Sequence, residues 1–568
     1  MELINKTISQ LLEENATKYP NHEAVVYVDD NLRYTWSELK KLVDQTAKAF
    51  ITLGVKRGEH IAIWGTNKLE WLLTQLASAR IGAALVTVNP EWKASEVAYA
   101  LKQSDSKVLV MMEGFEKKSG DKIHRYEYLK ILTEACPELN EVKSVGLNLN
   151  QFPELRHIVL ITKNPQPPAW ALSWRDFINR GSQVSENDFQ NIISSVSPQD
   201  VCLIQYTSGT TGFPKGAMLT HYNIVNNARD GAQNMELTYQ DRVCIPVPYY
   251  HCFGTVLGNM VCITSAATMV VPAEHFNARK TLIAVEKEKC TALHGVPSMF
   301  INELNDPEFH KFNLTSLRTG IMAGAPCPIE LMEDVVYKMG AKKITIVYGL
   351  TEASPITHQT RPDDSIERRV STVGKPLDHV QAKIVDPITE KELGIGEVGE
   401  IWVKGYNVMK GYYKKPEETA KAIVKDGWLR TGDLGTRDKD NYYKIVGRYK
   451  DMVIVGGHNV YPAEVEQTLL SLFEDEIMEI HVVGVPHKVL QEVVAAVIKL
   501  KPGKTLTLEE IKARCDGKVE WSKIPRYVKF VDNFSMAMTV TGKIQKFKLK
   551  ELLIKELGLE DLAKIKTA

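Results

Sequence analysis

Residues 201–216 read VCLIQYTSGTTGFPKG, an apolar run that passes directly into a loop of glycine, serine and threonine. A short apolar run that ends at a glycine-rich loop is typical of a buried strand. Glycines allow backbone N–H groups to turn inward, the hydroxyls add hydrogen-bond donors, and Lys215 adds a positive charge. The stretch therefore predicts a strand followed by a loop that suits a polyphosphate.

This loop departs from the common phosphate-binding P-loop, in which glycine and lysine are followed by serine or threonine. Here Pro214 precedes Lys215 and Gly216 follows it. A flexible linker of serine, threonine and glycine is the competing interpretation. Pro214 and the adjoining strand favour an ordered loop.

Outward from this loop, strand and helix patterns alternate through the first 450 residues or so. A capping box at Thr35-x-x-Glu38 predicts a helix start. We expect a helix near 71–79 and strands at 61–64, 84–88, 108–111 and 157–161. Such alternation predicts an α/β fold with a large N-terminal domain of parallel-rich sheets and flanking helices. Residues 113–150 are polar and weakly periodic, so we expect a surface elaboration there.

The pattern changes near residue 450, after a stretch rich in glycine and turn residues. A helix from residue 463, strands at 480–483 and 493–500, and a capping box at Thr507-x-x-Glu510 predict a small α+β domain. We therefore place an N-terminal domain at 1–449 and a C-terminal domain at 450–568, each large enough to fold as a unit.

Composition limits the partners. Seventy Lys and Arg residues balance seventy Asp and Glu residues among 568, which argues against a nucleic-acid partner and favours small-molecule substrates. Apolar runs long enough to span a membrane are not evident, so we expect no integral membrane segment. The N-terminus does not read as a targeting peptide. Cytoplasm is the expected location, with the mitochondrial matrix open if a transit peptide precedes this sequence; a homodimer is also left open.

Five motifs in order carry a family resemblance that spans nearly the whole chain. They are the loop at 206–221, YGLTEAS (348–354), GWLRTGDLG (427–435), GRYKDMVIVGGHNVYPAEVE (447–466) and TGKIQKFKLKE (541–551). The chain resembles the adenylate-forming enzymes, which include acyl-CoA synthetases, adenylation domains and beetle luciferases. Three stretches, THYNIVNN (220–227), PYYHCFG (248–254) and GKIQKFKLKE, are most similar to medium-chain acyl-CoA synthetases of the family member 2 type.

The resemblance implies an AMP-forming acid–thiol ligase that uses ATP, Mg²⁺ and coenzyme A, with a medium-chain fatty acid as the expected substrate. The carboxylate would attack the α-phosphorus of ATP, and the thiol of coenzyme A would then displace AMP. An adenylation enzyme for an aryl or other carboxylic acid, or one that loads a carrier protein, is the alternative within the family. A luciferase-like oxygenase, or a binding protein that has lost its chemistry, is the alternative from a different functional class.

The implied catalytic residues are Lys543, Thr351 and Glu352. Lys543 would bridge the carboxylate and the α-phosphate, Thr351 would contact the α-phosphate, and Glu352 would be the Mg²⁺ ligand. Without the motif, Lys543 would be read as a solvated surface lysine and Glu352 as an acid at a helix start.

The remaining residues implied by the resemblance bind nucleotide, coenzyme A or the acyl group. The predicted nucleotide and coenzyme A contacts are Thr207, Ser208, Gly209, Thr210, Thr211, Gly212, Lys215, Gly324, Ala325, Pro326, Tyr348 (adenine), Gly349, Asp433 (ribose hydroxyls), Arg448 (ribose or phosphate), Gly456 and Gly457. The predicted substrate pocket contains Tyr250, His251, Phe253 and Val296. Two roles are left open for His251: it gates the tunnel, or it is a buried core histidine.

The small domain combines two features that the chemistry uses at different times. Lys543 serves the first half-reaction, whereas Gly456 and Gly457 resemble the loop that lines the pantetheine tunnel in the second. We therefore expect the C-terminal domain to be mobile, with Lys450 as the hinge.

Overall fold

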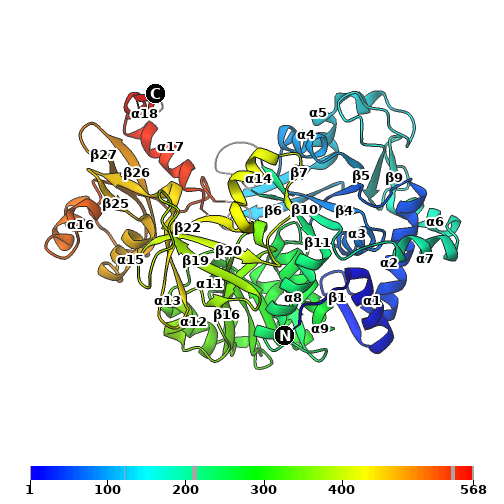
Figure 1. Ribbon diagram of the computed structural model, residues 1–568, viewed down its shortest axis with the longest axis horizontal. Coiled ribbons are helices and arrows are strands. Elements are labelled where there is room, and N and C mark those ends of the chain that lie inside the picture. Colours follow the sequence, from blue (N-terminus) through cyan, green and yellow to red (C-terminus); the bar gives the residue numbers. More distant parts are fainter. Residues whose placement is uncertain (1, 120–121, 208–213, 539–543, 566–568) are drawn as a thin grey trace. The chain divides into compact units, whose positions relative to one another are not determined.

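The computed structural model describes residues 2–119, 122–207, 214–538 and 544–565. The chain divides into two compact units, residues 1–381 with 403–429 and residues 382–402 with 430–568. The first unit contains two large sheets and a small two-stranded sheet, and the second contains a four-stranded and a five-stranded sheet with the C-terminal helices (Figure 1). Domain boundaries at 449/450 and a hinge at Lys450 stay predictions; Lys450 itself lies in the short helical turn η7 (Tyr449–Asp451).

One sheet of the first unit carries the strand that precedes the glycine-rich loop. Its strands run in the order β21 (Gly411–Tyr412), β11 (Lys215–Thr220), β10 (Val201–Thr207), β4 (Ala84–Val88), β3 (His60–Trp64), β5 (Ser106–Met112), β8 (His157–Ile161) and β9 (Ala171–Ser173). The strands from β10 to β9 pair in parallel, whereas β11 and β21 are antiparallel to their neighbours.

The other large sheet has the order β18 (Lys375–Pro376), β17 (Ile356–Gln359), β16 (Lys343–Gly349), β15 (Thr319–Ala323), β14 (Ala292–Gly295), β12 (Arg242–Cys244), β13 (Thr268–Val271), β1 (Glu23–Tyr27) and β2 (Leu32–Thr35). The strands from β16 to β1 are parallel. The parallel pairing in these two sheets confirms the predicted parallel-rich α/β fold. Parallel strands are buried on both faces, so helices are expected to cover them.

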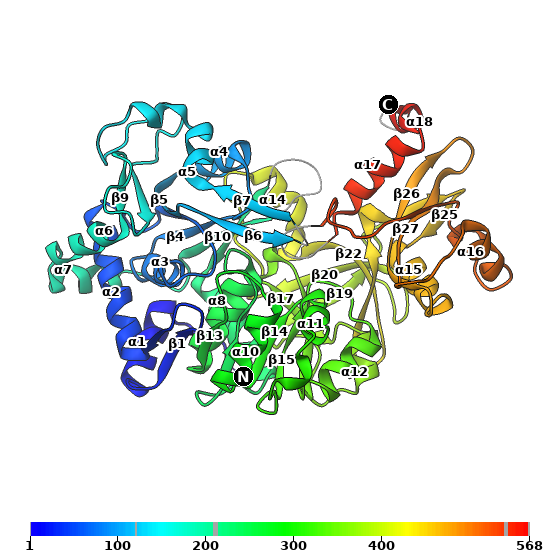
Figure 2. The same ribbon diagram turned by 180° about the vertical axis from the view of Figure 1, so that it is seen from behind.

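The helices of the first unit are α1 (Ile8–Lys18), α2 (Trp36–Thr52), α3 (Leu69–Arg80), α4 (Ala94–Gln103), α5 (Tyr128–Ala135), α6 (Trp174–Arg180), α7 (Glu186–Ser194), α8 (His221–Asn234), α9 (Val261–Ser265), α10 (Ala278–Glu288), α11 (Pro297–Leu304), α12 (Ile329–Tyr337), α13 (Ile366–Ser371) and α14 (Pro416–Ala422). Apolar residues of α10, α11 and α12 form a core with β14, β15 and β16 (Figure 2). Helix α8 contacts β11 of one sheet and β17 of the other.

Local sequence signals place these elements well. Thr35 and Glu38 form the predicted capping box at the start of α2, and Thr507 and Glu510 form the one at the start of α16 (Leu508–Cys515). The predicted strands and the helix near 71–79 are all present, and most of their ends shift by no more than two residues. The exception is the strand expected at 480–483, which extends over β26 (Ile477–His487), three residues earlier and four residues later. The capping boxes form because their side chains satisfy the first N–H groups of each helix. The strands and the helix follow from the periodicity of their apolar residues.

Residues 113–150 differ from the expected surface elaboration. They form the hairpin of β6 (Gly114–Ser119) and β7 (Lys122–Glu127), then α5, and part of the segment joins the core. Tyr128 is fully buried and stacks on Trp64 with 3.8 Å between ring centroids. The prediction was wrong because the apolar face of α5 is only two turns long, too short for its period to stand out from polar neighbours.

The second unit is built on two sheets, one of which is mixed. Strands β19 (Val380–Val385), β20 (Gly399–Gly405), β22 (Leu429–Arg437) and β23 (Tyr443–Arg448) form one sheet. The other contains β25 (His458–Val460), β24 (Val453–Val455), β27 (Gln491–Leu500) and β26 (Ile477–His487), and it is mixed because β28 (Tyr527–Phe530) pairs with β27 in parallel. Helices α15 (Pro462–Leu472) and α16 contribute to the core on one face of β26 and β27, and α17 (Lys546–Glu556) contributes on the other. The last helix, α18, spans Glu560–Ile565.

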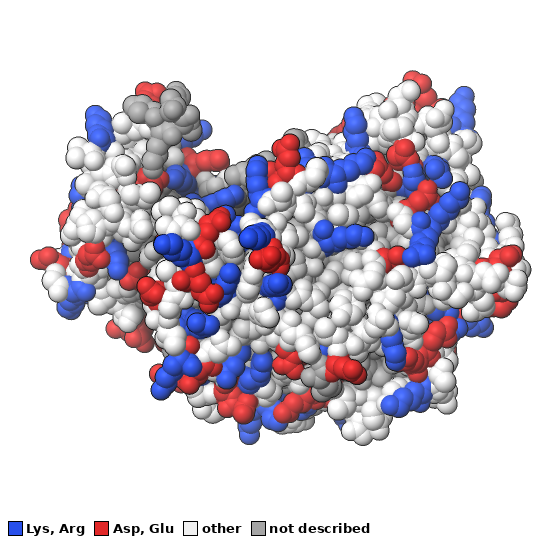
Figure 3. All heavy atoms as spheres, viewed as in Figure 1, with Lys and Arg blue, Asp and Glu red and all other residues white. Residues whose placement is uncertain are grey.

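On the face shown in Figure 3, acidic and basic side chains are interspersed, as the balanced composition predicts. Among the described residues, no helix is both long and apolar enough to cross a membrane.

Candidate active site

The carboxyl ends of β15 and β16 bring together two groups of predicted nucleotide contacts. Ala323, the last residue of β15, pairs in parallel with Val347 of β16. Gly324, Ala325 and Pro326 therefore leave the sheet beside Tyr348 and Gly349. Ligands of open parallel sheets bind at such carboxyl edges. The fold brings these five residues to an edge of that kind, and their contact with a nucleotide stays a prediction.

Gly349 fixes the turn that follows β16. A Cβ atom at this position would lie 1.9 Å from the carbonyl oxygen of Pro355, so no other residue fits without moving the backbone. The Leu350 N–H donates to the same carbonyl at 3.0 Å. This tight return sets the position of Thr351 and Glu352 in the short turn η5 (Thr351–Ala353).

Glu352 is held by the segment around β21. Its backbone carbonyl accepts a hydrogen bond of 2.8 Å from the Met409 N–H. Its Oε1 accepts a second, of 2.6 Å, from the phenol of Tyr412. Tyr412 is 5% exposed, and burial, followed by the nearby Glu352 carboxylate, raises the pKa of Tyr412 well above its usual range. The phenol therefore stays a hydrogen-bond donor at neutral pH.

The stem of the glycine-rich loop lies in the same unit. Thr207 and Lys215 are cross-strand neighbours at the ends of β10 and β11, and the Thr207 hydroxyl donates to the Lys215 carbonyl at 3.4 Å. Tyr99 of α4 donates from its hydroxyl to the Pro214 carbonyl at 3.1 Å. The predicted phosphate contacts Ser208, Gly209, Thr210, Thr211 and Gly212 lie outside the described residues.

Lys215 connects this stem to Glu352 through Tyr412. Its Nζ lies 4.4 Å from the centroid of the Tyr412 ring and 3.5 Å from Oε2 of Glu418. Strands β11 and β21 are neighbours, with Ala217 opposite Tyr412. One tyrosine thus lies between a predicted phosphate-binding cation and a predicted metal-binding carboxylate. The sequence reasoning missed Tyr412, although the Gly-Tyr-Tyr run at 411–413 is an aromatic signal beside a glycine.

The predicted acyl-pocket segment approaches Thr351. Cys252 Sγ lies 3.9 Å from the Thr351 hydroxyl oxygen. The Gln205 side-chain amide, at the end of β10, donates to the Tyr250 carbonyl at 2.5 Å, and His251 Nδ1 accepts from the Phe253 N–H at 3.1 Å. The segment beyond it, Phe253–Met260, is a fully buried π-helix, a form that is frequent at functional sites.

Phe253 lies beside His294 of β14, the strand that leads to Val296. The rings of Phe253 and His294 lie 5.9 Å apart, and Val296 follows two residues later as the cap of α11. Burial lowers the pKa of His294 to about 4, so this imidazole is neutral near pH 7. The structure brings the four pocket residues near Thr351 and β14; their role as an acyl pocket, and the choice between gate and core for His251, stay predictions.

In the second unit, two predicted ribose contacts bind each other. Asp433 on β22 is the cross-strand partner of Arg448 on β23, and Arg448 Nε donates to Asp433 Oδ1 at 3.0 Å. Asp433 is 6% exposed. The Asp433 N–H donates to the Thr431 hydroxyl at 3.1 Å. The sequence predicted both residues separately and gave no sign that they pair.

Gly456 and Gly457 form the two-residue turn between β24 and β25, with φ of 57° and 89°. Positive φ at both positions is the requirement of a type I′ hairpin turn. Trp521 packs within 3.6 Å of where a Gly456 side chain would begin. Lys543 lies outside the described residues; Met538 and Ile544, which flank it, pair as an antiparallel bridge.

Glu352 suits the magnesium ion that the resemblance implies. The described residues contain no group of three His, Cys, Asp or Glu side chains that could cage a metal. Mg²⁺ keeps several waters and takes one or two carboxylates together with substrate phosphates. A carboxylate anchored through one oxygen, with Lys215 nearby for phosphate, fits that pattern.

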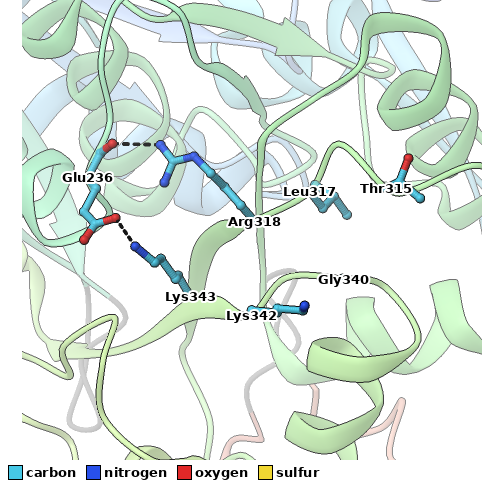
Figure 4. Close-up of a pocket in the computed structure, with 7 residues that line it drawn as sticks. All are labelled: Glu236, Thr315, Leu317, Arg318, Gly340, Lys342 and Lys343. Carbon is cyan, nitrogen blue, oxygen red and sulfur yellow. Dashed lines mark hydrogen bonds and ion pairs between the residues drawn. The ribbon is translucent and has the colours of Figure 1, made fainter.

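A separate cavity of about 600 Å³ lies at the opposite, amino end of β15 and β16 (Figure 4). Arg318 donates to the Glu236 carbonyl at 2.7 Å, and Lys343 pairs with the Glu236 carboxylate at 2.5 Å. Its lining contains none of the predicted site residues. Arg318 and Lys343 are already bonded to Glu236, and the cavity lies away from the edge where the nucleotide contacts gather.

The sequence places this fold and site in a known group. Residues 12–413 match the AMP-binding enzyme model, and residues 464–543 match the AMP-binding enzyme C-terminal domain. The chain belongs to the AMP-binding enzyme family. Protein YngI of Bacillus subtilis (strain 168) is 48% identical over 98% of this chain and 99% of its own length.

Two further relatives carry names with chemical content. Medium-chain acyl-CoA ligase ACSF2, mitochondrial, of Danio rerio is 41% identical, covering 98% of this chain and 90% of that protein. The crystal structure of the anthranilate CoA ligase AuaEII in complex with anthranoyl-AMP superposes with a TM-score of 0.81 at 26% identity, over 97% of this chain and 98% of AuaEII. The family and the α/β architecture predicted from sequence are thereby confirmed.

Proposed function

We propose that this protein is an ATP-dependent acyl-CoA ligase that forms an acyl-AMP and then an acyl-CoA. The observation that carries the proposal is the joint placement of Lys215, Tyr412 and Glu352 beside the carboxyl edge of β15 and β16. A cation for phosphate and a carboxylate for a metal are the two groups that a nucleotide polyphosphate needs. The relatives named as CoA ligases support this reading.

The reaction begins with an unreactive carboxylate. Its oxygen attacks the α-phosphorus of ATP, a P–O bond forms, and the bond to pyrophosphate breaks. Lys215 and the loop would bind the β- and γ-phosphates, and Lys543 would stabilise charge where the carboxylate meets the α-phosphate. Mg²⁺, held by Glu352, would neutralise phosphate charge when bound. Groups of this kind accelerate the step when they bind the transition state more strongly than the substrates.

The second step transfers the acyl group to sulfur. The thiolate of coenzyme A attacks the acyl carbonyl carbon, and AMP leaves with the shared oxygen. Gly456 and Gly457 would let the slender pantetheine approach the backbone, since neither residue has a side chain. Asp433 and Arg448 would bind the ribose and phosphate of the nucleotide. A rotation of the C-terminal domain about Lys450 would exchange Lys543 for the glycine turn between the two steps.

The identity of the acid is the finer part of the proposal. A medium-chain fatty acid is supported by the ACSF2 relative, and an aryl acid is supported by the likeness to an anthranilate CoA ligase. We favour the fatty acid, because the ACSF2 relative is the more similar of the two in sequence. A cytoplasmic location belongs to the same proposal, with the mitochondrial matrix as the alternative that the ACSF2 name suggests.

CoA-dependent release of AMP tests the function. The purified chain is incubated with ATP, Mg²⁺, coenzyme A and single acids, from about two to about eighteen carbons, together with benzoate and anthranilate. We expect the highest kcat/KM for an unbranched acid of intermediate length. A preference for aryl acids would support the alternative substrate. If no acid releases AMP or forms a thioester, the proposed function is wrong.

A further inference from the structure

Tyr412 combines three contacts that the established family motifs do not explain. Its hydroxyl donates to Glu352 Oε1 at 2.6 Å. Its ring lies 4.4 Å from Lys215 Nζ. Its backbone N–H donates to the Thr419 hydroxyl of α14 at 2.9 Å. A single buried side chain therefore touches the carboxylate and the cation, while its backbone is fixed from a third side.

The backbone around Tyr412 is tightly constrained. Strand β21 pairs with β11 through Ala217 opposite Tyr412 and Met218 opposite Gly411. Gly411 has φ of 139°, and a Cβ atom there would lie 2.8 Å from the Thr419 methyl group. The phenol is thus presented from a rigid position, which is what precise orientation of a partner requires.

The chemistry of the contact sets its consequence. An ionised carboxylate accepts hydrogen bonds at both oxygens, and a neutral phenol donates one hydrogen without neutralising the charge. The hydrogen bond to Oε1 therefore fixes the rotation of the carboxylate and leaves its negative charge for a cation. The ring face attracts the Lys215 ammonium through its quadrupole, which keeps that cation beside the carboxylate without a direct ion pair.

We propose that Tyr412 is a positioning residue that aims the Glu352 carboxylate at the magnesium of bound MgATP and holds Lys215 at the phosphates of the same nucleotide. This inference deepens the proposed function and rests on it. It assigns two separable contributions: the hydroxyl acts on the metal-dependent part of nucleotide affinity, and the ring acts on the phosphate-dependent part.

Equilibrium binding of ATP tests the inference without turnover. Isothermal titration calorimetry without acid or coenzyme A measures ATP affinity in excess Mg²⁺ and again in EDTA. For Tyr412→Phe we expect the gain in affinity due to Mg²⁺ to fall about 10-fold. Affinity in EDTA should stay within about twofold of wild type, because the ring and its contact with Lys215 remain. Tyr412→Leu should weaken binding under both conditions.

The neighbouring tyrosine provides a matched control. The Tyr413 hydroxyl donates to Asp105 Oδ2 at 2.7 Å, so Tyr413→Phe removes the same kind of hydrogen bond to a different carboxylate. We expect its Mg²⁺ dependence to equal that of wild type. Glu352→Gln provides a second test of the same metal-dependent affinity and should lose at least as much of it as Tyr412→Phe.

The outcomes separate the inference from the proposed function. If Tyr412→Phe keeps the full Mg²⁺ gain, or loses affinity equally with and without Mg²⁺, or if Tyr413→Phe behaves the same way, the positioning role is wrong. The acid panel with wild-type protein is scored independently. Wild-type thioester synthesis with an unaffected Tyr412→Phe variant would refute only the positioning role, whereas Mg²⁺-dependent ATP binding without thioester synthesis would refute only the ligase.

Discussion

Two carboxylates, the half-buried Glu352 in the first unit and the buried Asp433 in the second, were both predicted to serve the nucleotide, and the structure gives them opposite partners. Glu352 accepts from the neutral phenol of Tyr412. Asp433 accepts from the guanidinium of Arg448 and forms an ion pair with it. A neutral donor leaves a carboxylate its charge, whereas a cationic donor compensates it. Glu352 is therefore suited to a metal ion, and Asp433 to neutral hydroxyl groups such as those of ribose.

The largest effect should come from removing the charge of Glu352. Glu352→Gln keeps the size of the side chain and loses its negative charge, so we expect the adenylation rate to fall roughly 10²–10³-fold. Glu352→Asp should recover part of the loss because it restores the charge. Acid-dependent exchange of pyrophosphate into ATP measures this step. Equal rates for the Gln and Asp variants would show that charge is not what Glu352 contributes.

Asp433→Asn should have a smaller and different effect. The amide oxygen still accepts one hydroxyl, but Arg448 loses its charged partner, so we expect ATP affinity to fall about 10-fold. The Mg²⁺ concentration needed for half-maximal activity should not change. Titration of the adenylation rate with Mg²⁺, at saturating ATP, checks this. A change in the Mg²⁺ concentration for half-maximal activity would show that Asp433, like Glu352, acts on the metal, and the proposed difference between the two carboxylates would be wrong.

The smallest effect concerns alkaline pH. Burial and the Glu352 carboxylate raise the pKa of Tyr412 in the folded state, whereas an unfolded tyrosine ionises near pH 10. The stability that this protonated phenol contributes is present below about pH 10 and is lost as the pH rises above it. Between about pH 9 and pH 11, the Tm of wild type should fall about 1–2 °C more than that of Tyr412→Phe. Identical slopes in a calorimetric scan would contradict the assignment.

Much of the fold could be predicted because its signals are local. The buried strands around 61–64 and 84–88, and the capping boxes at Thr35 and Thr507, depend on residues within one element. The burial of α5 was not predicted, because the helix covers only eight residues among polar neighbours. Element type is therefore readable where a period repeats several times.

The residues of the candidate site likewise divide into those that local motifs predict and those that only tertiary contacts reveal. Glu352, Tyr348 and Lys215 were predicted from motifs, and parallel pairing of β15 with β16 brings Gly324 beside Tyr348. Tyr412 escaped notice because its meaning depends on contacts with Lys215 and Glu352, which are 197 and 60 residues away in sequence. A two-residue strand has no period of its own, so only tertiary structure reveals it.

Strand β11 also bears on synthesis and on truncation. Its outer edge is covered by β21, which arrives almost two hundred residues later in the chain. An uncovered strand edge with buried neighbours is a template for aggregation. During translation this edge stays open until residue 412 has left the ribosome, and the Thr419 hydroxyl that binds the Tyr412 N–H follows later still. Any fragment meant to represent the nucleotide half of the enzyme should therefore extend beyond α14.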